Sequence, residues 1–304
     1  MKNDVILQVK NLTKSYGKMT LRAVDDISFE VRRGEFFCFL GPNGAGKSTT
    51  IKIITTLLQQ DKGEYYLNGS ADDVYIRSKI GVVFQENTSD NLLTVKENIF
   101  YMGGLYLPNK AELNAKYDEL RNTLDLAEFE NKQFRFLSGG QKRRVEIAKA
   151  LIGSPEILFL DEPTTGLDPE SRKVIWSIIE GLQKQKNLTV FLTTHYMHET
   201  NDADYVVILN KGKIYAQGTP SELKNRYAND ILKIKPKKKQ SLKAYLAEKG
   251  FADTEIADTL TVKNLSVEQN IAVLTDNKDN IASFELIKGT MDDVFIAVVE
   301  GESK

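Results

Sequence analysis

The sequence predicts an α/β protein followed by a small α+β domain. A continuous apolar run at 36–40, typical of a buried parallel strand, precedes a helical pattern of apolar residues between 48 and 58. A second buried strand is predicted at 157–160, where the chain reads ILFL. Of the 304 residues, 41% are hydrophobic, which is enough for more than one well-formed core.

Before residue 228 the sequence also predicts an antiparallel strand layer and a mainly helical region. Residues 5–35 are expected to form an antiparallel strand layer, because apolar and polar residues alternate at 27–31 and a turn follows at 33–34. Residues 88–150 are mainly helical in pattern, with clear segments at 95–105 and 111–126. A further helix is expected at 142–152. We expect this first domain to span residues 1–228.

The second domain is expected to span residues 229–304. Its pattern predicts three strand and helix pairs in turn, at 232–234, 242–248, 259–262, 267–274, 282–287 and 291–299. Thr290, Asp292 and Asp293 could cap the last helix. Six lysines occur between 231 and 243. They indicate either a solvated linker or strand edge, or a surface that contacts anionic lipid headgroups.

A phosphate-binding loop follows the first buried strand. The stretch GPNGAGKST matches G-x-x-x-x-G-K-[ST] and lies between a predicted strand and a predicted helix. Its glycines let successive N–H groups face phosphate oxygens at the helix N-terminus. Lysine neutralises the β- and γ-phosphates, and serine offers a hydroxyl to Mg²⁺. The candidate nucleotide-binding residues here are Gly41, Asn43, Gly44, Ala45, Gly46, Lys47, Ser48 and Thr49.

Two carboxylates end the second buried strand. Asp161 is placed to hold Mg²⁺ directly or through water, and Glu162 is free to orient and polarise a water. Either residue alone would be an ordinary solvated acid, so the pair gains its meaning from the phosphate loop. Downstream of the loop, Ser138, Gly139, Gly140 and Gln141 stand at the start of a predicted helix, which is a good anion site.

Together these motifs resemble the nucleotide-binding subunit of an ATP-binding cassette (ABC) transporter. The resemblance covers about residues 4–225 and rests on GPNGAGKST, LSGGQ, ILFLDE, LTKSYG, VVFQE, TTGLDP and LTTHYMHE. It implies a P-loop NTPase cassette with a mixed sheet core, an antiparallel β subdomain and a helical subdomain at about 88–150. The stretch after VVFQ and the end, GTMDDVFIAVVEG, resemble the daunorubicin-resistance sub-family, whose relatives mostly export drugs, lipids or other amphiphiles.

The resemblance also implies a role for single residues. Tyr16 would stack on adenine, a contact that any positioned aromatic ring can make. Gln85 would give a side-chain carbonyl to Mg²⁺, and His195 would hold the attacking water with Glu162. Asp168 belongs to the loop that crosses to a partner cassette. Without the resemblance, each of these would be an ordinary packing or polar residue.

The family arrangement further implies that one chain is incomplete. LSGGQ completes the ATP site of the opposite cassette, so two ATP molecules lie between two head-to-tail cassettes. Since the chain has one cassette and no internal repeat, a homodimer and a separate membrane permease are the expected partners. The net charge of −1 favours no nucleic acid partner.

Composition narrows the remaining alternatives. The sequence has no run of 18 apolar residues and no secretory signal pattern, so we expect a cytoplasmic protein, peripheral on the inner face of the membrane. The single cysteine, Cys38, is expected to be buried and excludes an intrachain disulfide. The competing functions are a soluble ABC ATPase acting on ribosomes or DNA, an importer subunit, and a P-loop kinase. The last has no use for LSGGQ or His195.

Overall fold

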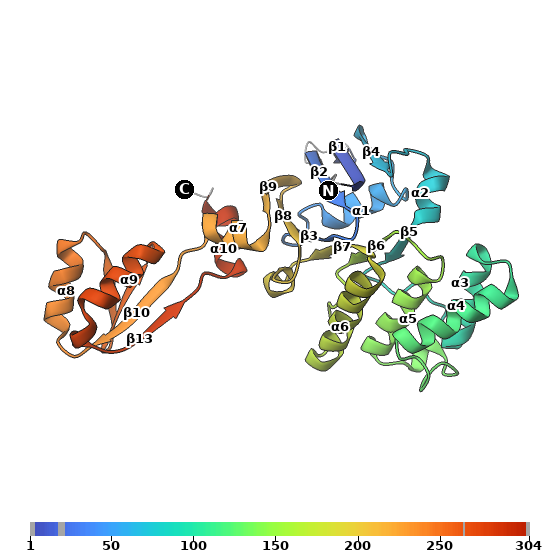
Figure 1. Cartoon of the computed structure of the whole chain (residues 1–304). Coiled ribbons are helices and arrows are strands. Elements are labelled where there is room, and N and C mark those ends of the chain that lie inside the picture. Colours follow the sequence, from blue (N-terminus) through green and yellow to red (C-terminus); the bar gives the residue numbers. More distant parts are fainter. Residues whose placement is uncertain (1–3, 18–21, 264, 302–304) are drawn as a thin grey trace. The chain divides into compact units, whose positions relative to one another are not determined.

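The computed structural model describes residues 4–17, 22–263 and 265–301. These residues form two compact units, which divide between Gln217 and Gly218 (Figure 1). Helix α7 (Pro220–Tyr227) packs against α10 (Met291–Glu300) and so lies in the second unit. The division therefore falls one short helix before residue 228, the boundary expected from the sequence.

The first unit is built on a six-stranded sheet with the spatial order β5-β6-β7-β3-β8-β9. Neighbouring strands from β5 to β8 are parallel. Every residue of β3, β6 and β7 is buried, which explains why each strand contains a run of consecutive apolar residues, FFCFL, ILFL and VFL, rather than an alternating pattern. The strands are β3 (Phe36–Leu40), β5 (Ile80–Val83), β6 (Ile157–Asp161), β7 (Thr189–Thr194), β8 (Tyr205–Asn210) and β9 (Lys213–Gly218).

A second, three-stranded sheet has the order β2-β1-β4 and is antiparallel throughout. It consists of β1 (Val5–Ser15), β2 (Arg22–Arg32) and β4 (Lys62–Leu67). Phe29 of β2 meets Phe39 of β3 with ring centroids 4.8 Å apart, and Phe39 in turn meets Phe191 of β7 at 4.9 Å. This aromatic cluster joins the two sheets into one core, and the predicted α/β fold class is confirmed.

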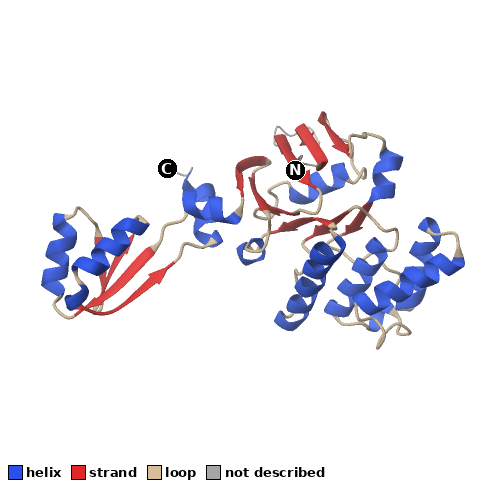
Figure 2. Ribbon diagram, viewed as in Figure 1, coloured by secondary structure: helices blue, strands red, loops and turns tan. Residues whose placement is uncertain are grey.

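Helices of residues 95–151 gather beside β5, at one edge of the parallel sheet (Figure 2). The helices of the first unit are α1 (Lys47–Ile54), α2 (Asp73–Lys79), α3 (Val95–Tyr106), α4 (Lys110–Thr123), α5 (Gly139–Leu151) and α6 (Pro169–Lys186), with short 3₁₀ turns at Phe134–Phe136 and Met197–Thr200. Helix α1 ends at Ile54, before the predicted residue 58, because Thr56 takes a left-handed conformation with φ 63°.

The second unit contains a four-stranded antiparallel sheet of order β11-β12-β10-β13. Its elements are β10 (Ile231–Pro236), α8 (Lys239–Glu248), β11 (Asp253–Ile256), β12 (Thr259–Lys263), α9 (Val267–Asp276) and β13 (Ile281–Ile287), in addition to α7 and α10. Strand β11 was not predicted, because its sequence DTEI is short and mostly polar. No helix among the described residues is long and apolar enough to span a bilayer.

Candidate nucleotide site

The phosphate loop, Asp161, Glu162 and His195 converge at the carboxyl ends of β3, β6 and β7. In the parallel register Leu40 is opposite Thr194, and Asp161 is opposite Thr193. The Gly41 N–H donates to the Thr194 carbonyl at 3.2 Å, so the loop after β3 is tied to the end of β7. Ligands of open α/β sheets bind outside the carboxyl ends of the strands, and this edge is such a place.

The phosphate loop is shaped by Gly46. This residue has φ 106°, and a Cβ on it would lie 2.3 Å from the Ala23 carbonyl oxygen. Only glycine fits there, and the chain then enters α1 at Lys47. The Lys47 side chain is 4% exposed, and its ammonium donates to the Gly41 and Pro42 carbonyls at 2.7 and 3.2 Å. The cation is therefore held inside the loop, at the N-terminus of a helix.

Glu162 links this cation to the predicted histidine. Its Oε1 is 3.3 Å from the Lys47 ammonium, and its Oε2 is 3.1 Å from Nδ1 of His195. The carboxylate is 7% exposed, and its backbone has φ 47°, an unusual conformation for a residue other than glycine. The Glu162 N–H donates to the carbonyl of Thr193 on the neighbouring strand at 3.1 Å, which fixes this turn.

Ser48 and Asp161 offer oxygen atoms to a cation. The Ser48 hydroxyl donates to Asp161 Oδ1 at 3.1 Å, and the Thr193 hydroxyl donates to the same oxygen at 2.6 Å. No cluster of three or more His, Cys, Asp or Glu side chains that could hold a metal occurs in the described part of the chain. A hydroxyl and one carboxylate fit Mg²⁺, which takes few protein oxygens and completes its shell with phosphate and water.

Tyr16 and Gln85 lie at the margins of this region. The Tyr16 ring is 51% exposed, and its hydroxyl is 3.5 Å from Thr49 Oγ1 at the end of the phosphate loop. An exposed aromatic ring beside the loop is available for stacking. Gln85 follows β5 and is exposed, with its backbone carbonyl accepting from Arg143 at 3.0 Å.

The LSGGQ stretch at 137–141, called the signature segment from here on, leads into α5. Ser138 caps the helix: its hydroxyl accepts from the Gln141 N–H at 3.3 Å, and the Gln141 side chain accepts from the Ser138 N–H at 3.0 Å. Ser138 and Gly139 are exposed, whereas Gly140 is buried against Ser171 of α6. Capping by reciprocal bonds leaves other N–H groups of the first turn available to an anion.

Asp168 stands at the start of the neighbouring helix. Its carboxylate caps α6 by accepting from the Ser171 N–H at 2.9 Å. Hydrogen bonds from Ser171 lower the pKa of Asp168. Because Ser171 also touches Gly140, the loop that carries Asp168 and the signature segment are packed together within one chain.

The structure thus brings the phosphate loop, Asp161, Glu162 and His195 into one cluster. Among the described residues, no hydrogen bond or ion pair joins Ser138, Gly139, Gly140 or Gln141 to the phosphate loop. Within the described ranges the signature segment is therefore not bonded to this cluster, and its residues Ser138 and Gly139 are exposed.

Two residue types at the site were missed by sequence reasoning. Thr193 bonds Asp161 and also accepts from the Glu162 N–H at 3.2 Å. Glu199 is a buried carboxylate that accepts hydrogen bonds from the hydroxyls of Thr164 and Thr194. The available signal was a run of threonines at strand ends followed by an acid, but only the fold shows that they meet.

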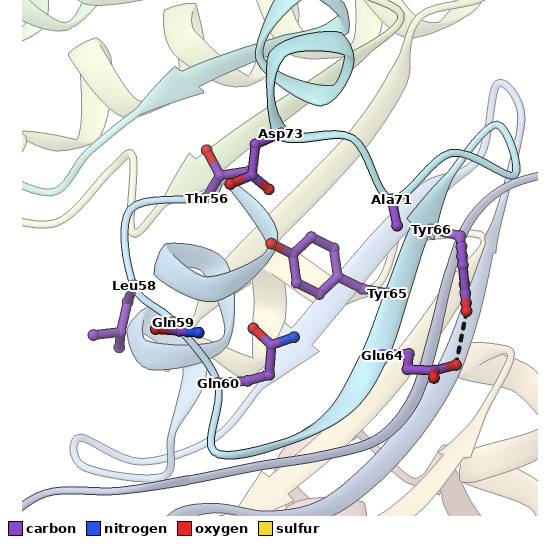
Figure 3. A pocket seen from close by; sticks show the side chains of 9 residues that line it. All are labelled: Thr56, Leu58, Gln59, Gln60, Glu64, Tyr65, Tyr66, Ala71 and Asp73. Atoms are coloured by element: carbon purple, nitrogen blue, oxygen red, sulfur yellow. Dashed lines mark hydrogen bonds between the residues drawn. The ribbon is translucent and has the colours of Figure 1, made fainter.

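A cavity of about 600 Å³ lies elsewhere, beside β4 and the turn after α1 (Figure 3). Tyr65, Tyr66 and Asp73 are among its lining residues, and the Tyr66 hydroxyl donates to Glu64 at 2.7 Å. None of the predicted site residues lines it. The cavity therefore has no part in the nucleotide site.

Two family models match the two parts of this chain. Residues 24–165 match the family model "ABC transporter", and residues 218–299 match "ATP-binding protein DrrA1-3-like, C-terminal domain". The chain is 35% identical to a doxorubicin resistance ATP-binding protein of Mycobacterium tuberculosis, over 92% of this chain and 81% of that protein. It is 38% identical to a linearmycin resistance ATP-binding protein of Bacillus subtilis, over 75% and 73%.

Solved structures extend the likeness to the fold. A bacterial ABC transporter cassette, solved as a dimer, superposes with a TM-score of 0.64 at 30% identity, covering 70% of this chain and 98% of that one. The same cassette in a post-hydrolysis state bound to ADP and Pi gives a TM-score of 0.63.

Proposed function

Because the chain belongs to the ABC transporter family as an ATP-binding subunit, we propose that two copies close around two ATP molecules and drive a separate membrane permease. The chain is an ATPase. We propose a role for each site residue in hydrolysis and a transport task that the hydrolysis drives. The observation that carries it is the buried Glu162 carboxylate, held between the Lys47 ammonium and the His195 ring.

In this proposal Glu162 acts on the attacking water. The water oxygen bonds to the γ-phosphorus while the bond to the leaving ADP oxygen breaks, and Glu162 takes the water proton. His195 keeps the carboxylate and the water in line, and Lys47 with the N–H groups of the loop neutralises charge on the transferred phosphate. Tyr16 stacks on the adenine.

The proposed ligands of Mg²⁺ are Ser48, Asp161 and Gln85. When it is bound, Mg²⁺ would supply positive charge to the phosphate oxygens. The convergence of the Ser48 hydroxyl and Asp161 at the sheet edge supports the first two. Gln85 is proposed from the family resemblance.

The second half of each site comes from another copy of the chain. At this helix N-terminus Ser138 and Gly139 are exposed, Gln141 is half-buried and Gly140 is buried. None of the four is bonded to the phosphate loop of its own chain within the described residues. A two-fold dimer places each signature on the partner's ATP and yields two competent sites. The γ-phosphate then supplies the differential contact that favours the closed dimer.

We propose export of a drug, a lipid or another amphiphile as the transported task. The support is likeness to relatives named for doxorubicin, daunorubicin and linearmycin resistance. Docking on a permease would place the chain at the cytoplasmic face of the membrane. We further propose that the lysine-rich segment contacts anionic headgroups through lysines other than Lys239 and Lys243, which both pair with Glu255 in the structure.

The second unit is proposed to stabilise the dimer or to regulate the ATPase. It has its own core, formed by β10, β12 and helices α8 and α9, so it is folded as a separate body. Removing residues 218–304 should then weaken dimerisation or change the basal ATPase rate. Unchanged behaviour in both would remove this role.

The test of the proposed mechanism is Glu162→Gln. We expect hydrolysis to fall by about 10² to 10⁴, the usual contribution of a positioned general base. The protein should accumulate as an ATP-bound dimer, seen by size-exclusion chromatography with light scattering. Glu180→Gln, which changes a partly exposed acid of α6 paired with Lys184, is the matched control. A Glu162→Gln protein that stayed monomeric with ATP and Mg²⁺ while hydrolysing normally would contradict the mechanism.

A further inference from the structure

Helix α5 carries a row of buried charges that the nucleotide chemistry does not use. Arg143, Glu146 and Lys149 are three residues apart, so they lie on one side of the helix. They are only 5%, 4% and 7% exposed. All three contact the segment 84–89, which follows β5 and contains Gln85.

Each contact is a directed hydrogen bond. Arg143 donates from Nη1 to the Phe84 carbonyl at 2.6 Å and from Nη2 to the Gln85 carbonyl at 3.0 Å. Glu146 accepts four bonds, from the Thr88 N–H at 3.0 Å, the Thr88 hydroxyl at 2.8 Å, the Ser89 N–H at 2.9 Å and the Ser89 hydroxyl at 2.7 Å. The backbone of the segment is thus held at both ends by one helix.

Lys149 closes the network. Its ammonium donates to both hydroxyls, Thr88 Oγ1 and Ser89 Oγ, at 3.0 Å each, and lies 3.5 Å from Glu146 Oε2. Burial lowers the pKa of Arg143 and of Lys149, and the nearby Glu146 opposes that effect in both cases. Burying charges is costly unless they are paired or hydrogen-bonded. Here Lys149 pairs with Glu146, and the Arg143 guanidinium is bonded to two backbone carbonyls.

Such a network differs from apolar packing in what it specifies. Apolar contacts tolerate sliding, whereas four bonds to one carboxylate fix both the position and the orientation of the segment 88–89. The same helix begins at the cap residue Ser138. The network therefore sets the offset between Gln85 and the signature residues of its own chain.

We propose that Glu146, supported by Arg143 and Lys149, is a positioning residue that makes the segment 84–89 and the signature end of α5 move as one body. A displacement at Gln85 is then passed to Ser138 and Gly139, and so to the ATP of the partner chain. Glu146 touches no nucleotide and acts through these residues. The inference rests on the roles of Gln85 and the signature in the proposed function.

The first test is a distance measurement. Spin labels at Glu86→Cys and Lys142→Cys report the distance between the segment 84–89 and the start of α5. The native cysteine, Cys38, is fully buried and should not take up a label. We expect one narrow distance distribution, unchanged by ATP and Mg²⁺, in the labelled protein. Glu146→Gln should broaden it, since an amide cannot accept all the bonds that the carboxylate accepts and cannot balance Lys149.

The control is Glu130→Gln in the same group of helices. Glu130 also accepts hydrogen bonds from two side chains, Arg121 and Tyr117, but it does not contact the segment 84–89. A general loss of helix stability would affect both variants alike. If Glu146→Gln left the distribution as narrow as Glu130→Gln does, the proposal would be overturned.

The second test is functional and uses the Glu162→Gln background. Adding Glu146→Gln should weaken ATP-driven dimerisation about fivefold or more, the range of ordinary coupling energies, while ATP binding to the monomer changes less than about twofold. Equal dimerisation with and without Glu146→Gln would contradict the proposal. Failure of Glu162→Gln alone to dimerise would instead count against the proposed function, and the distance test would still decide the present inference.

A second variant guards against misfolding of Glu146→Gln. The double substitution Thr88→Val with Ser89→Ala removes both hydroxyls from the segment side and leaves α5 intact. It should broaden the same distance distribution. A distribution that stayed narrow in this variant would likewise overturn the proposal.

Discussion

Gly140→Ala probes the close contact between the signature segment and α6. A Cβ on Gly140 would lie 2.5 Å from the Ser171 hydroxyl oxygen and 2.8 Å from the Ser171 Cβ. Real Cβ atoms do not approach other heavy atoms so closely, so one helix must shift. Overpacking of this kind costs about 1–3 kcal/mol. We expect the free energy of unfolding of the first unit to fall by that amount.

The assay is urea unfolding followed by the fluorescence of the single tryptophan, Trp176. This residue lies on α6 and packs on Phe36 of β3, with ring centroids 5.9 Å apart, so it reports the unit that contains the contact. The slope of the transition should be unchanged, because the exposed surface on unfolding is the same.

Two further variants sharpen the result. Gly104→Ala in α3 is the matched control: a Cβ there meets nothing within 4 Å, so the substitution should be neutral or stabilise by about 0.5–1 kcal/mol. Adding Ser171→Gly to Gly140→Ala removes the clashing atoms and should recover part of the loss. If Gly140→Ala proved as stable as Gly104→Ala, the reasoning from close packing would be refuted.

Two other predictions concern the adenine and a half-buried cluster of ion pairs around Glu156. Tyr16→Ala should weaken ATP binding by about 1–3 kcal/mol, the value of a base stacked on an aromatic ring, and Tyr16→Phe should leave the dissociation constant nearly unchanged in a fluorescence titration. Hydrogen bonds from Arg33, Lys79 and Asn68 lower the pKa of Glu156 from its ordinary value of 4.5 to about 2. The folded pKa lies below the unfolded value, so this stabilisation is present above about pH 4.5 and is lost as pH falls toward 2. Glu156→Gln should therefore cost about 1–2 kcal/mol at pH 7, after allowance for solvent screening, and flatten the acid side of a stability profile; an unchanged profile would contradict the assignment.

The sequence predicted well those features that depend on local pattern. The buried strands at 36–40 and 157–160 are continuously apolar because both of their sheet faces are covered. Such an apolar run can be recognised in the sequence alone. The phosphate loop is read directly from its glycines, lysine and serine. The end of α1 was misplaced, because the left-handed turn at Thr56 leaves no signal in apolar spacing.

Features that depend on contact between distant segments could not be predicted. Thr193 meets Asp161 only through the pairing of β6 and β7, and Glu199 meets Thr164 only when both lie at the same sheet edge. The charged row of α5 looks like an ordinary polar helix face in the sequence, since Arg143, Glu146 and Lys149 are of residue types that are usually exposed to solvent. Their burial follows from the path of the segment 84–89, which the sequence pattern does not fix.

The central claim is that each ATP site is shared between two chains. Lys47→Ala and Ser138→Arg each alter one half of the site, and each homodimer should be nearly inactive. Ser138→Arg should still bind ATP as a monomer, because the phosphate loop is intact. When the two proteins are mixed, a heterodimer joins an intact Lys47 on one chain to an intact Ser138 on the other, so ATPase activity should return. Lack of any recovery on mixing, with monomer binding by Ser138→Arg abolished, would contradict the shared site.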